Sequence, residues 1–65
     1  MRIEVKKVRE QRNVSLRALA QRTGLSRSKL HRIEKGERDP GLSELELIAK
    51  ALHVRISDLY ESEYK

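Results

Sequence analysis

Hydrophobic residues recur along the chain at the spacing of short amphipathic helices. The clearest repeat lies in residues 42–52, where five apolar residues follow one helical face: Leu42, Leu45, Ile48, Ala49 and Leu52. Weaker stripes of the same period predict further helices, over residues 2–12, 16–22, 27–35 and 56–61. Helices this short are not stable alone in water, so the pattern predicts one compact all-α bundle of five helices.

Polar and glycine residues at the expected helix ends support this division. Ser15 and Ser26 precede two of the helices, where a serine hydroxyl can accept a hydrogen bond from an unpaired backbone amide. Candidate stop residues stand where four helices should end: Asn13, Gly24, Gly36 and His53. Glycine and, to a lesser degree, asparagine tolerate the left-handed conformation that often follows a helix. We therefore expect a single domain over residues 1–65, with a frayed tail at 61–65.

Composition removes several classes of protein. The 65 residues include no cysteine, Phe or Trp, so the core must be built from aliphatic side chains without disulfides or thiolate metal sites. Two histidines fall short of the three or four ligands of a metal site, and we expect no metal, no cofactor and no catalysis. No apolar run approaches the ~20 residues of a membrane span, and the N-terminus lacks the apolar segment of a signal peptide, so a cytoplasmic protein is the default expectation.

The net charge of +5 is unevenly distributed. Residues 1–38 hold 12 Lys/Arg against 4 Asp/Glu, a balance of +8, whereas residues 39–65 hold 3 against 6, a balance of −3. A basic face of this kind is typical of proteins that bind polyanions such as nucleic acids. A solvated Lys/Arg-rich surface without a ligand is the alternative interpretation.

Residues 15–36 read as two short helices joined by a tight turn at 23–25. The second of these helices has a narrow apolar edge, Leu30 and Ile33, and a polar remainder: Arg27, Ser28, Lys29, His31 and Arg32. A helix that buries one edge and presents a basic, hydrogen-bonding surface fits the groove-reading helix of a helix-turn-helix.

The combination of these segments resembles the Cro/repressor-type (lambda-repressor-like, XRE) helix-turn-helix family of bacterial and phage DNA-binding domains. The resemblance covers roughly residues 3–60 and rests on the segments 5–10, 15–28, 33–36 with Pro40 following, and 45–52. It implies a five-helix domain whose third helix docks in the major groove. It also implies base-reading roles for Arg27, Ser28 and Arg32, and an internal salt bridge between Arg9 and Glu34.

Some positions depart from that family pattern. Leu16 stands where many members have Gln, Asn13 and His53 replace common glycines, and Gly41 and Arg55 replace residues that cap the last two helices. The contact that a glutamine side chain makes to phosphate or bases is therefore not carried over to residue 16, although the backbone amides at the start of that helix could still hold a phosphate. The last helix is expected to fray.

Arg27 and Arg32 are the strongest candidates for reading bases. They are five positions apart on the helix, so they lie about 140° apart around its axis and can reach both sides of a groove that holds the helix. An arginine fork can bond both acceptors of a guanine edge, although contacts from both residues to phosphate alone are the alternative. His31 is a further candidate for a base or a phosphate contact. Candidate phosphate contacts elsewhere are Lys6, Arg17, Lys29 and Arg38.

These features predict sequence-specific binding to double-stranded DNA by a repressor-like transcriptional regulator. One helix reads only a few base pairs, so we expect a homodimer on a palindromic operator with half-sites about 34 Å apart. Candidate dimer contacts lie in the more apolar second half: Leu47, Val54, Ile56 and Tyr60. The alternative is an antitoxin that binds a toxin partner and autoregulates its operon.

Overall fold

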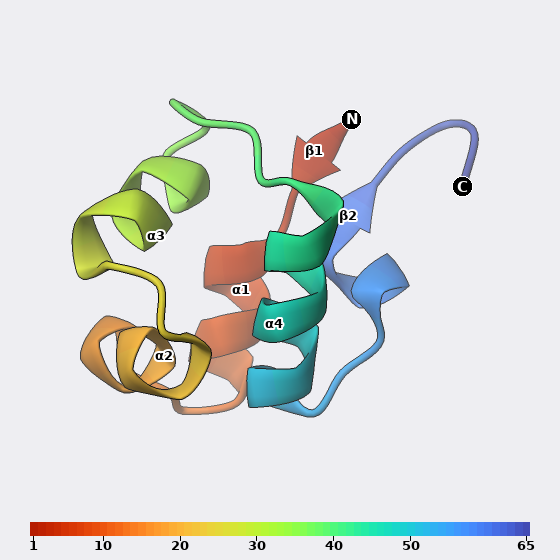
Figure 1. The fold of residues 1–65 in the computed structure, drawn as a ribbon. Helices are drawn as coiled ribbons and strands as arrows, with labels where there is room; N and C mark the ends of the chain where they lie inside the picture. The colour runs from red at the N-terminus through yellow and green to blue at the C-terminus, as the bar shows by residue number, and fades with distance from the viewer.

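The computed structural model describes all 65 residues and contains four α-helices, one 3₁₀ helix and a two-stranded sheet (Figure 1). The α-helices are α1 (Val5–Gln11), α2 (Leu16–Thr23), α3 (Arg27–Glu34) and α4 (Leu42–Leu52). The 3₁₀ helix is η1 (Ile56–Leu59), and the strands are β1 (Arg2–Ile3) and β2 (Tyr60–Glu61). The helical bundle is therefore as expected, with four α-helices in place of five.

The five-helix prediction is wrong at the two ends of the chain. Residues expected to begin the first helix form β1, which pairs antiparallel with β2 so that Ile3 lies opposite Tyr60. The backbone amide of Glu4 then donates to the carbonyl of Leu59 at 2.8 Å. The expected fifth helix is only the short η1, because the chain extends into β2 at Tyr60. The ends are thus held by pairing with each other, which residue-by-residue helical periodicity does not reveal.

The expected frayed tail is also partly ordered against this sheet. The Lys65 ammonium donates to the Tyr60 carbonyl at 3.0 Å and to the Glu61 carboxylate at 2.8 Å. Its Nζ also lies 5.4 Å from the centre of the Tyr60 ring. The last residues therefore turn back along β2.

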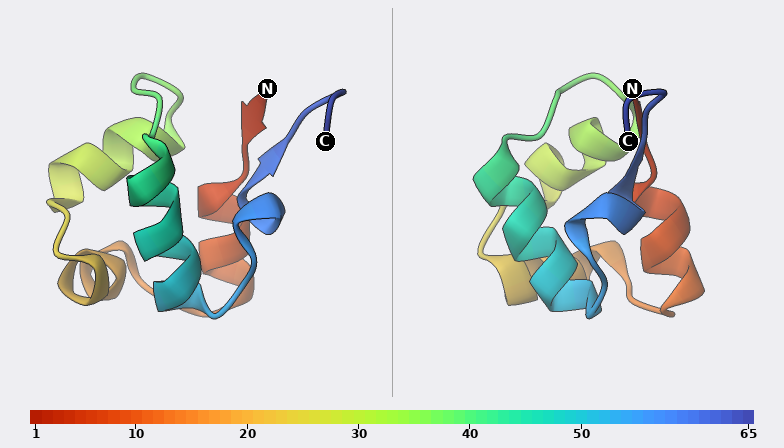
Figure 2. Two further views of the ribbon diagram at one scale, coloured as in Figure 1. Left: turned by 45° about the vertical axis from the view of Figure 1, so that its right-hand side comes forward. Right: turned by 90° about the vertical axis from the view of Figure 1, so that its right-hand side faces the viewer.

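The core is aliphatic and centres on α4. This helix packs against α1, α2 and η1, and α2 in turn packs against α3 (Figure 2). Eleven apolar residues are buried: Val5, Val8, Val14, Leu19, Leu30, Ile33, Leu45, Ile48, Ala49, Leu52 and Leu59. Every α-helix contributes to this cluster, so each short helix is stabilised by its neighbours.

α4 and η1 begin without a serine cap, yet the backbone amide at the start of each has a hydrogen-bond acceptor. At α4 the amide of Gly41 donates to the Glu44 carboxylate at 2.9 Å, and at η1 the amide of Arg55 donates to Asp58 at 3.0 Å. A carboxylate three residues into the helix thus reaches back to the start, which is one half of a capping box.

Candidate nucleic-acid interface

α2, the turn after it and α3 form the helix-turn-helix predicted for residues 15–36. The Ser15 hydroxyl accepts from the amide of Ala18 at 3.0 Å, and the Ser26 hydroxyl accepts from the amide of Lys29 at 3.0 Å. Gly24 ends α2 at φ +78°, a left-handed conformation that glycine adopts at little cost. Both serine caps and the glycine stop are therefore confirmed.

Thr23 fixes the turn in a way that the sequence pattern did not indicate. Its buried hydroxyl donates to the Leu19 carbonyl at 2.8 Å and accepts from the amide of Leu25 at 3.2 Å. One side chain therefore satisfies a carbonyl of α2 and an amide of the turn. A threonine immediately before the helix-ending glycine was the available signal.

α3 lies at the edge of the molecule with one face on the core and the other in solvent (Figures 1 and 2). Leu30 and Ile33 are fully buried against the bundle. All four predicted base-reading residues are exposed on the rest of the helix: Arg27, Ser28, His31 and Arg32. Lys29 is half-buried, and the Glu34 side chain is buried at the end of the helix. The geometric requirement for a groove-reading helix, an exposed polar rod on a buried apolar edge, is met.

Three of these four residues surround one open depression. Arg27, Ser28 and His31 line it together with Leu16, at the start of α2. Arg32 lies outside this depression, one turn further along α3 than Ser28. The structure therefore brings the start of α2 next to the first turn of α3, as a surface that could follow a groove and its edge.

The four predicted phosphate contacts fall into two groups. Arg17 on α2 and Lys6 on α1 are exposed and have no carboxylate partner. Lys29 and Arg38 instead form ion pairs with one carboxylate oxygen of Glu44, at 3.2 and 3.3 Å. Arg17 and Lys6 are therefore unpaired, whereas the charge of Lys29 and Arg38 is partly neutralised by the one carboxylate that they share.

Two further arginines of the basic half serve the end of α4. Arg12 donates to the His53 carbonyl at 3.5 Å, and Arg22 donates to the Ala51 carbonyl at 3.4 Å. Cations are favoured at a helix C-terminus, where carbonyls lack partners and the dipole is negative. Part of the +8 balance of residues 1–38 is thus used within the fold.

The expected ion pair between Arg9 and Glu34 is present and bidentate. Arg9 Nε and Nη2 donate to the two Glu34 oxygens at 2.7 and 3.2 Å, and Nη1 donates to the Val14 carbonyl at 2.9 Å. The two side chains are only 12% and 4% exposed. The hydrogen bonds that Arg9 donates to the Glu34 carboxylate raise the pKa of Arg9 above its ordinary value. The pair joins α1 to the end of α3 and so fixes how α3 sits on the bundle.

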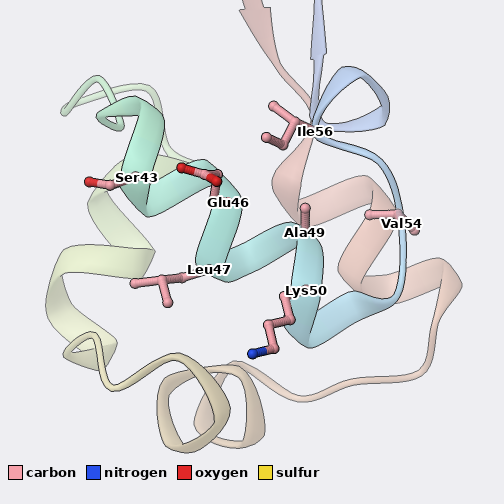
Figure 3. A pocket seen from close by; sticks show the side chains of 7 residues that line it. All are labelled: Ser43, Glu46, Leu47, Ala49, Lys50, Val54 and Ile56. Carbon is pink, nitrogen blue, oxygen red and sulfur yellow. The ribbon is translucent and has the colours of Figure 1, made fainter.

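Three of the four predicted dimer contacts share one shallow apolar depression on the outer face of α4 (Figure 3). Leu47, Val54 and Ile56 line it together with Ser43, Glu46, Ala49 and Lys50. Tyr60, the fourth, lies apart from it in β2 and is half-buried. The depression and the exposed side of α3 are formed by different elements.

None of the helices has the length and apolar character that crossing a membrane requires. No three His, Cys, Asp or Glu side chains converge as metal ligands would.

The fold and the exposed α3 define a helix-turn-helix domain, and comparison with known proteins gives its family. The helix-turn-helix model HTH_3 matches residues 5–59. The chain belongs to the HTH_3 helix-turn-helix family.

The similar proteins are named as transcriptional regulators, and they are considerably longer than this chain. Two of them are uncharacterized HTH-type transcriptional regulators of Mycobacterium tuberculosis, from strains CDC 1551 / Oshkosh and ATCC 25618 / H37Rv. Each is 43% identical to this chain over 56 residues, and the match covers 86% of this chain and 40% of the relative. An HTH_3 family transcriptional regulator from Vibrio cholerae has a crystal structure that matches with a TM-score of 0.78 and 41% identity, over 83% of this chain and 30% of that one.

Proposed function

We propose that this domain binds double-stranded DNA sequence-specifically, as part of a transcriptional regulator, with α3 in the major groove. The observation that carries the proposal is the exposed polar face of α3, on which Arg27, Ser28, His31 and Arg32 stand over a buried Leu30–Ile33 edge. Membership of the HTH_3 family supports it. The Arg9–Glu34 pair and the Thr23 hydroxyl hold this helix in place.

Base reading by the arginines is testable once a preferred site has been selected from random duplex DNA. Arg27→Ala or Arg32→Ala should lose preference mainly at one base position, because a bidentate contact to guanine gives about 1–3 kcal/mol of discrimination. Affinity measured over every single-base variant of the site would show this. Arg55→Ala, an exposed arginine outside the helix-turn-helix, is the matched control and should leave the profile unchanged. Uniform weakening over the whole panel would reassign the arginine to phosphate.

The proposed DNA-binding form is a homodimer joined through the outer face of α4. Leu47, Val54 and Ile56 supply an apolar centre, and Glu46 and Lys50 stand on its rim with opposite charges. A two-fold interface places one patch against itself, so a patch with an acid on one side and a base on the other can pair with a second copy. Two copies would place two α3 helices on neighbouring half-sites.

Leu47→Glu tests this interface. Leu47 is 42% exposed, so the change should leave the fold intact while placing a charge at the centre of the patch. We expect sedimentation on a palindromic duplex to show two copies of the wild type and one of the variant. Leu42→Glu, on the same helix at 70% exposure and outside the depression, should still bind as two copies. Equal stoichiometry for all three proteins would contradict the interface.

A further inference from the structure

Glu44 occupies a junction between α3, the loop after it and α4. One of its carboxylate oxygens accepts from the Gly41 amide at 2.9 Å. The other oxygen accepts from Lys29 Nζ of α3 at 3.2 Å and from Arg38 Nη2 of the loop at 3.3 Å. Both cations are among the residues that the sequence predicted to contact DNA phosphates.

The carboxylate is held in place and stays ionised. Only 15% of the Glu44 side chain is exposed. The Gly41 hydrogen bond, followed by those from Lys29 and Arg38, lowers the pKa of Glu44 to about 2. The negative charge therefore persists throughout the neutral pH range, and the start of α4 keeps it from turning away.

For Lys29 and Arg38, Glu44 offers the kind of charged oxygen acceptor that a DNA phosphate would offer. If either cation moved to phosphate it would exchange one charge-assisted hydrogen bond for another. The exchange would also leave the Glu44 carboxylate with fewer cation partners while it lies beside the phosphates. The negative charges of the carboxylate and the phosphates would then repel each other. The exchange thus gains little and adds a repulsive contact, so the internal pairs should persist in the complex.

We propose that Glu44 limits sequence-independent DNA binding by keeping Lys29 and Arg38 in internal ion pairs, away from the phosphate backbone. The inference rests on the proposed binding to DNA and revises which residues contact it. The remaining predicted phosphate contacts outside α3 are Lys6 and Arg17, which are exposed and have no carboxylate partner. Discrimination between sequences is thereby left to the exposed face of α3, because fewer contacts are shared by every DNA.

The salt dependence of binding to random-sequence duplex measures this effect. Glu44→Gln keeps an oxygen that can accept from the Gly41 amide but removes the charge that holds Lys29 and Arg38. Each newly neutralised phosphate changes the slope of log affinity against log salt by about −0.9, so the slope should steepen by about 0.9–1.8. The ratio of affinities for the selected site and for random duplex should fall.

Matched variants separate local release from a general change of charge. Glu63→Gln makes the same substitution at an exposed carboxylate of the C-terminal segment, which pairs with no lysine or arginine and lies outside both proposed interfaces, and it should leave the slope at the wild-type value. Lys29→Ala should leave the slope unchanged when Glu44 is present. In the Glu44→Gln background the same Lys29→Ala change should reduce the steepening by about 0.9.

The outcomes are decisive in either direction. A slope for Glu44→Gln equal to that of wild type, or a loss of about 0.9 on Lys29→Ala alone, would overturn the inference while leaving DNA binding intact. If circular dichroism shows that Glu44→Gln does not fold, Lys29→Ala and Arg38→Ala decide the question in the presence of Glu44. Absence of duplex binding by the wild type would instead reject the proposed function itself.

Discussion

The arginines of this chain differ mainly in what each already binds. Arg9 uses three of its nitrogens on Glu34 and Val14 and is 12% exposed, whereas Arg27 and Arg32 are exposed on α3 without a carboxylate partner. A guanidinium removed from water requires such partners, because an unpaired buried charge is strongly destabilising. The same residue type is thus a structural clamp at one position and a candidate DNA contact at others.

Glu34→Ala should destabilise the fold by about 3 kcal/mol, because it strands the largely buried Arg9 charge. For a domain of this size that corresponds to a fall in melting temperature of roughly 12 °C or more, measured by circular dichroism. Glu37→Ala is the control, since its pair with Lys35 is more than half exposed on both sides and should contribute less than about 1 kcal/mol. Equal melting temperatures for the two variants would show that Arg9 is solvated without Glu34.

At the scale of elements, the helices begin in two different ways. α2 and α3 use serine hydroxyls that precede the helix, whereas α4 and η1 use carboxylates that lie within it. The second kind of helix start makes the contacts at the beginning of α4 depend on the protonation state of Glu44, because this carboxylate must be ionised to hold Lys29 and Arg38. α4 is also the centre of the core, so this start affects the whole bundle.

Acid should therefore weaken the domain through Glu44. Its pKa is about 2 in the folded protein against an ordinary value of 4.5, so the unfolded chain takes up its proton first. The stabilisation is complete above pH 4.5 and is lost as the pH falls toward 2. Unfolding midpoints should differ most between wild type and Glu44→Gln at pH 6, and the difference should shrink by pH 2.5. Glu46→Gln should follow the wild type at every pH; a constant difference for Glu44→Gln would contradict the assignment.

The elements that the sequence predicted well are those with local signals. The apolar stripe of residues 42–52, the Ser15 and Ser26 caps and the turn at Gly24 each act within a few residues, and the structure contains all of them. The pairing of Ile3 with Tyr60 joins residues far apart in the chain, and strands of two residues have no period to detect. The engagement of Lys29 by Glu44 is likewise tertiary, so composition alone counted that lysine as free positive charge.

At the scale of the whole molecule, the two ends of the chain close the bundle. β1 pairs with β2, and Leu59, directly before β2, is fully buried while its carbonyl accepts from Glu4. A chain of this length buries only about 60% of its unfolded surface, so its stability margin is small. Loss of even a few contacts made by the last residues should therefore lower the free energy of unfolding appreciably.

Leu59→Ala should cost about 2–5 kcal/mol, because it removes a fully buried side chain from the core. Much of the domain should then be unfolded at 37 °C, as thermal melts followed by circular dichroism would show. Leu42→Ala makes the same change at a side chain that is 70% exposed and should shift stability by less than about 0.5 kcal/mol. A similar small shift for both would mean that the C-terminal segment is not part of the cooperative unit.

The pairing of β1 with β2 also brings the first and last residues out together, across α4 from α3 (Figure 2). A polypeptide with neighbouring ends can be ligated head to tail or spliced into a loop of a host protein without distorting its backbone. Tethers, fluorophores or fused partners attached at Met1 or Lys65 would accordingly extend away from α3, which makes either end suitable for immobilisation in single-molecule work on duplexes.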